Sequence, residues 1–260
     1  MGGRRELGRR FDPALLRLLE KLNRADLGHL GRLESLVVPE EPLADELKYS
    51  PLPVKSSWAT VYPKAIIVDQ PSQTFGAYEH GVMVRWGPIS SGSNGAPTPS
   101  GLFHLNWRSI ARTSTKNAQY IMHSYFNFYS ARGLAFHQFD LPGLPASHGC
   151  IRLLERDARW LYVWGEEWVL DEKARHVVKE GTPVLIVGQY DFASPPPWVQ
   201  LAWLARGVYL PAAVSIKAGC APSPAPLPAW GAVADPRLPY RSGAEWAPSG
   251  PAGPSPQAHC

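Results

Sequence analysis

The spacing of apolar residues predicts helices in the first part of the chain. Leucines recur at helical intervals after Asp12 and Pro13, an N-cap residue followed by a proline that suits a first helical turn. A second short helix is expected over about residues 26–33, ahead of the apolar segment SLVVP. Residues 12–48 are therefore predicted to form a small helical segment.

The pattern then changes to that of short strands. Residues 49–63 are rich in Pro and Ser, which is typical of a linker, and residues 90–101 have the composition of a loop. Strands are expected at KAIIVD, on both sides of a turn at residues 79–81, and at GLFHL, YIMHSYF, LAFH, CIRL and GTPVLIV. With a helix at about residues 155–164, the segment 64–187 is predicted to be mainly β with one or two helices.

The last part of the chain, residues 188–260, has a third pattern. It holds 14 of the 27 prolines, many of them among Ala, Ser and Gly. Such a segment buries too little apolar surface to offset its ordering entropy. We expect a largely disordered Pro-rich extension that carries Cys220 and Cys260.

Composition and charge narrow the class of protein. The chain has 260 residues, of which 45% are hydrophobic, enough for a globular core. Its net charge of +4 is scattered, which suits an anionic cell-envelope polymer and argues against a nucleic-acid partner. The basic N-terminus is followed by an amphipathic stretch instead of an apolar core, so no export signal is visible, and the apolar run at 198–216 is too interrupted to be a membrane span.

The segment ASHGCIRL, residues 146–153, is the strongest candidate for chemistry. Its cysteine, Cys150, belongs to no CxxC pair, and three scattered cysteines do not form a disulfide framework. A nucleophilic cysteine needs an imidazole to remove its proton. His148 is two residues away on the same face of an extended chain, and His137 ends the expected strand LAFH, from which the loop QFDLPGLPA can return to Cys150.

The neighbours of Cys150 have candidate roles of their own. Gly149 permits a sharp turn, so that the amides of Gly149 and Cys150 can hold an oxyanion. Ser147 can orient His137 or the substrate, and Arg152 can bind a substrate carboxylate. The alternatives are that Cys150 is a packing residue, that Arg152 pairs with Glu155, or that His137, His148 and Cys150 bind zinc, although no Glu lies beside them to act as a base.

This arrangement resembles the catalytic domain of the L,D-transpeptidases, enzymes of peptidoglycan cross-linking. Their signature, an upstream histidine and then Ser/Thr-His-Gly-Cys, a hydrophobic residue and Asn or Arg, is matched by His137 and by residues 147–152, although Gln138 stands where glycine is common. The stretches KAIIVD, PTPSGLFHL and GTPVLIV also resemble strands of that family. The resemblance implies an L,D-transpeptidase-type β-sandwich.

The resemblance also implies the reaction. Cys150, activated by His137, would attack a stem tetrapeptide, release D-Ala and pass the acyl group to an amine of a neighbouring stem, giving a 3-3 cross-link. This chemistry needs no cofactor and no metal, and the family is acylated by carbapenems. Transfer to water would instead make an L,D-carboxypeptidase or a cross-link hydrolase, and loss of catalysis would leave a peptidoglycan-binding module.

Two further expectations follow from the resemblance. The substrate implies action in the cell envelope or periplasm, and because no export signal is visible, we expect the true start to lie upstream. Residues 23–39 resemble the second half of a LysM peptidoglycan-binding repeat, with an Asn-containing turn, a helix and a short strand that ends at proline. A helical hairpin packed on the main domain is the alternative.

Overall fold

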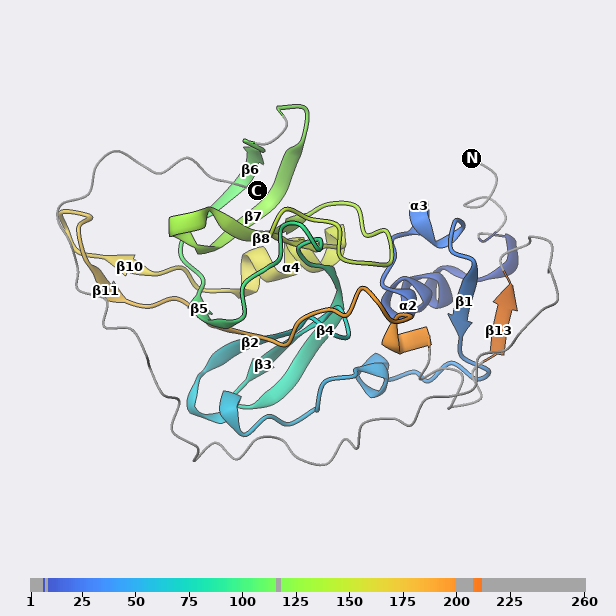
Figure 1. Cartoon of the computed structure of the whole chain (residues 1–260). Coiled ribbons are helices and arrows are strands. Elements are labelled where there is room, and N and C mark those ends of the chain that lie inside the picture. The colour runs from blue at the N-terminus through green and yellow to red at the C-terminus, as the bar shows by residue number, and fades with distance from the viewer. Residues whose placement is uncertain (1–6, 8, 116–117, 200–207, 212–260) are drawn as a thin grey trace. The chain divides into compact units, whose positions relative to one another are not determined.

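The N-terminal segment has two helices, as predicted, and the apolar segment after them forms a strand. The structure is a computed structural model that describes residues 7, 9–115, 118–199 and 208–211 (Figure 1). The segment consists of α2 (Pro13–Asn23), α3 (Leu27–Leu30) and β1 (Ser35–Val38). The Asp12 carboxylate accepts the amides of Ala14 and Leu15 at 2.8 and 3.0 Å, which confirms the predicted N-cap.

Asn23 connects the end of α2 to β1. Its side chain accepts the Val37 amide at 2.7 Å and donates to the carbonyl oxygens of Val37 and Leu19, each at 2.9 Å. β1 pairs antiparallel with β13 (Val208–Pro211), a strand inside the Pro-rich extension. The rest of the extension beyond residue 199, including Cys220 and Cys260, lies outside the described residues.

The main body is one nine-stranded sheet. Its strand order is β5-β12-β2-β3-β4-β9-β8-β7-β6, and the pairs β12–β2 and β8–β9 are parallel while the others are antiparallel. The strands are β2 (Lys64–Asp69), β3 (Thr74–Glu79), β4 (Val82–Ser90), β5 (Gly101–His104), β6 (Arg108–Thr113), β7 (Ile121–Tyr129), β8 (Leu134–Gln138), β9 (Ile151–Leu153) and β12 (Pro183–Val187).

Strand β4 joins the two halves of this sheet. Its residues 82–88 pair with β3, and its last two residues pair with β9. One core cluster contains residues of both halves, among them Phe75 and Phe136, so the halves face each other across common apolar packing. Helix α4 (Glu155–Trp164) packs against β7 and β8 and adds Ala158 and Leu161 to this core. The fold is mainly β, as predicted for an L,D-transpeptidase-type domain.

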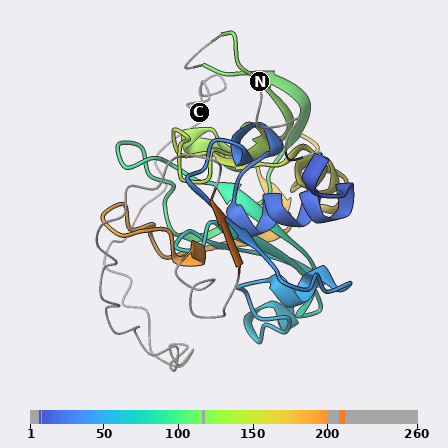
Figure 2. The ribbon, with the colours of Figure 1, turned by 90° about the vertical axis from the view of Figure 1, so that its right-hand side faces the viewer.

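The stretch predicted as a linker is packed on the sheet. It contains the 3-10 helix η2 (Trp58–Val61) and follows η1 (Glu46–Tyr49). Ala59 is fully buried in a second cluster with residues of β2, β3 and β4. The β3–β4 turn comes so close that a Cβ on Gly81 would lie 2.5 Å from the Thr60 methyl group. Residues 49–63, although rich in Pro and Ser, therefore form a strap with fixed contacts on the sheet. Figure 2 views the molecule from the side of the N-terminal helices.

Some elements were not predicted. The strands β6, β10 (Val169–Leu170) and β11 (Val177–Lys179) and the 3-10 helix η3 (Ser130–Arg132) gave no signal in the sequence. Every residue of β6 is at least partly exposed, so the strand lacks the alternation that marks a half-buried strand. Within the described residues, no helix has the length and apolar character needed to cross a membrane.

Candidate active site

The sheet brings His137 and Cys150 to neighbouring strands. His137 lies on β8, which is paired in parallel with β9 in the register His137 to Arg152. Cys150 is the residue directly before β9, two positions before Arg152. The loop between His137 and Cys150 therefore returns the chain to the same edge of β8, as the sequence predicts.

The surroundings of His137 fix its protonation. The ring is 4% exposed, and Nδ1 lies 3.0 Å from the carbonyl oxygen of Gln138. A carbonyl can only accept, so in the neutral ring Nδ1 carries the proton and Nε2 keeps a lone pair. Burial lowers the pKa of His137 to about 4; the hydrogen bond to Gln138 opposes this shift, and the charge of Arg152 adds to it. His137 is therefore a neutral proton acceptor at pH 7.

Cys150 is buried at the start of β9, with 1% of its surface exposed. Its sulfur is in a disulfide in this structure. A sulfur in a disulfide cannot act as a thiolate nucleophile, so any nucleophilic role of Cys150 requires reduction first.

The turn before Cys150 depends on glycine and on a serine hydroxyl. Gly149 has φ +106°, and a Cβ there would lie 3.1 Å from Leu134 Cδ2. Ser147 Oγ donates to the Cys150 carbonyl at 2.5 Å and accepts the Gly149 amide at 3.1 Å. The Ser147 hydroxyl is thus hydrogen-bonded to the backbone of this turn, and the Gly149 amide donates to that hydroxyl.

A second layer of small polar residues supports the turn and was missed by sequence reasoning. Thr98 Oγ1 donates to the Gly149 carbonyl and accepts the Gly92 amide, each at 2.9 Å. Ser147 exchanges backbone hydrogen bonds with the same loop, donating to Ser91 and accepting from Ser93. The signal in the sequence is the density of hydroxyl residues in SSGSNGAPTPSG, a composition that by itself indicates only a loop.

Arg152 lies beside His137 on a shared aromatic ring. Its guanidinium lies 4.7 Å from the centroid of Phe139, and the same ring meets His137 edge-on at 5.9 Å. Arg152 also donates to the Asp140 carbonyl at 3.5 Å. The alternative pairing with Glu155 is absent, because Glu155 pairs with Arg159 at 3.3 Å.

The remaining candidate is His148. It is exposed, whereas His137 is buried. In the part of the chain that the structure describes, no group of three or more His, Cys, Asp or Glu side chains is arranged to hold a metal ion.

Comparison with known proteins assigns the domain. Residues 63–186 match the family model of the L,D-transpeptidase catalytic domain (YkuD), just under half of the chain. No curated protein matches the chain.

Among solved structures, an L,D-transpeptidase from Stackebrandtia nassauensis is 22% identical with a TM-score of 0.40, over 50% of this chain and 57% of that one. An L,D-transpeptidase from Mycobacterium smegmatis is 19% identical with a TM-score of 0.39, over 48% and 59%. L,D-transpeptidase 3 from Mycobacterium tuberculosis, in complex with a faropenem-derived adduct, is 22% identical with a TM-score of 0.38, over 48% and 60%. The chain spans less than two thirds of each of these three proteins. The family model nevertheless places residues 63–186 of this chain in the L,D-transpeptidase catalytic domain family.

Proposed function

We propose that this protein is a peptidoglycan L,D-transpeptidase that works through a thioester on Cys150. The observation that carries the proposal is the placement of His137, with a free Nε2 lone pair, one strand from Cys150. The family of residues 63–186 supports it. The substrate is a peptidoglycan stem peptide, and because this polymer lies outside the cytoplasmic membrane, we place the action of the protein in the cell envelope.

The first half of the reaction makes the acyl-enzyme. His137 accepts the proton of the reduced Cys150 thiol, and the sulfur attacks the carbonyl that joins the third stem residue to the terminal D-Ala. The Cys150 amide is the donor that we assign to the oxyanion, because the Gly149 amide is bonded to Ser147. The imidazolium then gives its proton to the leaving D-Ala amine, and a thioester remains.

The second half transfers the acyl group. A side-chain amine of a neighbouring stem attacks the thioester, His137 accepts the amine proton, and the thiolate leaves and is reprotonated. The product is a 3-3 cross-link. Arg152, at the edge of this site, is assigned to binding a substrate carboxylate. The thiolate would attack the ring carbonyl of a carbapenem in the same way as it attacks the stem peptide carbonyl, and would open the ring.

The test is to incubate the reduced full-length protein with a disaccharide tetrapeptide and to measure product masses, with Cys150→Ala as the control. A dimer formed with loss of one D-Ala, absent with Cys150→Ala, is the expected result. A tripeptide alone would replace the proposal with an L,D-carboxypeptidase. Unchanged tetrapeptide that nevertheless binds to both proteins would indicate a binding module, and cleavage of a supplied dimer would indicate a cross-link hydrolase.

A further inference from the structure

The loop that joins His137 to Cys150 is paired with the N-terminal segment. The Asp26 amide donates to the Leu141 carbonyl at 3.0 Å, and the Leu141 amide donates to Asp26 Oδ2 at 2.7 Å. Ala25 and Pro142 form an antiparallel bridge beside these bonds. A residue more than a hundred positions upstream thus binds the middle of this loop through both its backbone and its side chain.

The contact is buried and closely fitted. Leu141 is fully buried. Gly143 has φ +88°, and a Cβ on it would lie 3.1 Å from Leu33 Cδ2. On its other side the loop is held by β4, where Ser90 Oγ donates to the Leu144 carbonyl at 2.8 Å and accepts the Ala146 amide at 3.0 Å. The loop is therefore fixed between β4 and the N-terminal segment.

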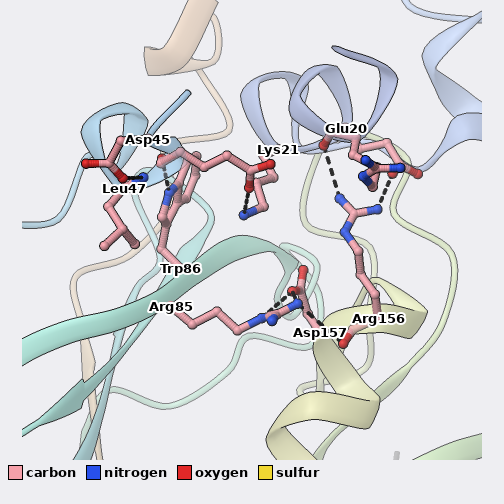
Figure 3. A network of polar contacts seen from close by, with 10 residues as sticks. Glu20, Lys21, Asp45, Leu47, Arg85, Trp86, Arg156 and Asp157 are labelled. Carbon is pink, nitrogen blue, oxygen red and sulfur yellow. Dashed lines mark hydrogen bonds and ion pairs between the residues drawn. The ribbon is translucent and has the colours of Figure 1, made fainter. Parts of the chain in front are cut away.

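The N-terminal segment is itself anchored to the catalytic domain. Arg24 is buried, donates from Nε to the Ser72 carbonyl at 2.8 Å and lies over the rings of Trp86 and Trp198. Figure 3 shows a second set of anchors, in which Arg156 of α4 pairs with Glu20 of α2.

The 3-10 helix η1, which precedes the sheet, completes these anchors. Lys21 pairs with Glu46 at 2.6 Å, and the indole of Trp86 donates to the Glu46 carbonyl at 2.7 Å. Because α2 is paired with both α4 and η1, Asp26 is presented to the loop from a segment that is anchored to the catalytic domain on two sides.

We propose that Asp26 is a positioning residue of the active site, which sets the loop that carries Cys150 relative to His137. This inference rests on the proposed acyl transfer at Cys150. It assigns this role to Asp26 alone among the residues of the N-terminal segment that cap a helix, because Asp26 is the one that binds the loop before the nucleophile. A misplacement of about 1 Å at a reacting group can cost on the order of 100-fold in rate.

The two carboxylate oxygens of Asp26 have different partners. Oδ1 accepts the amides of Gly28 and His29 at 2.7 and 3.1 Å and so caps α3. Oδ2 accepts the Leu141 amide. The His29 ring lies within 3.0 Å of both oxygens. Asparagine has only one accepting oxygen. Asp26→Asn is therefore expected to keep part of the function, and Asp26→Ala to lose both roles.

Asp12 provides a matched control. Its carboxylate caps α2 in the same way as Asp26 caps α3, but Asp12 is exposed and its bonds are to α2 alone. Asp12→Ala and Asp26→Ala both remove a cap, and both are expected to lower the melting temperature. Only Asp26→Ala also removes an acceptor from the loop before Cys150.

The experiment measures two rates on reduced full-length proteins. One is acylation by the disaccharide tetrapeptide, and the other is alkylation of Cys150 by iodoacetamide across pH, followed by peptide mass mapping. For Asp26→Ala we expect acylation roughly 10- to 100-fold slower with little change in KM, and a pH profile of alkylation that differs from that of the wild type, with a slower reaction near neutral pH. Asp26→Asn should be intermediate, and Asp12→Ala should match the wild type in both rates.

The outcomes separate the two proposals. Equal rates for Asp26→Ala and wild type, or equal slowing by Asp12→Ala and Asp26→Ala, would overturn the role of Asp26. If the wild type is not acylated but Asp26→Ala still moves the alkylation profile, the positioning role stands and the proposed function fails. If Asp26→Ala does not melt cooperatively, the same comparison is made with Asp26→Asn.

Discussion

Nδ1 of His137 lies 3.0 Å from the carbonyl oxygen of Gln138, its own neighbour on β8. This hydrogen bond places the proton of the neutral ring on Nδ1 and leaves Nε2 to accept a proton from Cys150. The carbonyl belongs to the backbone, so the tautomer does not depend on which side chain follows His137. The glutamine at position 138 is therefore compatible with a working histidine.

Replacement of the histidine tests its role as base and acid. His137→Ala should slow acylation by the tetrapeptide by roughly 100- to 10,000-fold, the usual contribution of a positioned acid–base group. The Cys150 thiol should still react with iodoacetamide at high pH, where no base is needed. Stopped reactions analysed by mass spectrometry give the rate, and the same replacement at the exposed His148 should leave it unchanged. Equal loss in the two variants would contradict the assignment.

The burial of His137 predicts a pH dependence of stability in the oxidised protein. In an unfolded chain a histidine titrates near pH 6.5, whereas burial lowers the pKa of His137 to about 4. Between these values the unfolded chain binds a proton that the folded protein does not. Stability is therefore complete above pH 6.5 and falls by on the order of 3 kcal/mol as the pH drops to 4.

Denaturant unfolding between pH 4 and 7.5 measures this loss of stability with falling pH. His137→Gln, which cannot titrate, should show a smaller loss. Reduction of Cys150 should also reduce this loss of stability to the extent that the freed thiol ionises beside the imidazole, because a neighbouring negative charge raises the pKa of His137. A pKa of His137 that is the same with and without reductant, measured from its ring proton resonance, would show that the two side chains do not interact.

Two glycines of the loop at residues 90–101 differ in whether a side chain can be added. A Cβ on Gly92 would lie 2.2 Å from the Ala96 carbonyl oxygen and 2.5 Å from the Thr98 amide, whereas a Cβ on Gly95 would have no heavy atom within 4 Å. Gly92→Ala must displace the backbone that supports Ser147, so we expect a lower melting temperature and slower acylation. Gly95→Ala should stay within about 0.5 kcal/mol of the wild type. Thermal unfolding of the pair checks this, and equal stabilities would contradict it.

Ser147 is expected to act through the turn that it holds. Ser147→Ala leaves the buried Gly149 amide without its acceptor, at a cost of about 1–3 kcal/mol, and removes the donor to the Cys150 carbonyl. Acylation should slow, and Ser147→Thr, which keeps the hydroxyl, should restore most of the rate. Urea unfolding and acylation rates are the measurements. A threonine variant as slow as the alanine variant would show that the hydroxyl is not what matters.

Much of the fold was predictable because it depends on local patterns. The buried run KAIIVD is β2 from Lys64 to Asp69, and α4 begins at Glu155 and ends at Trp164 as expected. By contrast, β6 was missed because its residues are exposed, and the strap at 49–63 was interpreted as a linker because its packing comes from long-range contacts that composition does not reveal.

Some residues of the candidate site could likewise be predicted from the sequence, and others could not. His137, Gly149 and Cys150 were predicted from one short motif and one spacing. Asp26 and Thr98 were not, because each meets the site only after the chain has folded, across more than fifty residues of sequence. Their residue types, a helix cap and a loop threonine, are too common to be noticed without those contacts.

The formation of a thioester on Cys150 is tested by the intact mass of the reduced protein after brief incubation with the disaccharide tetrapeptide. We expect a covalent adduct with the mass of the substrate minus D-Ala, located on Cys150 by peptide mapping and missing from Cys150→Ala. An adduct on another residue, or product formed equally well by Cys150→Ala, would contradict it.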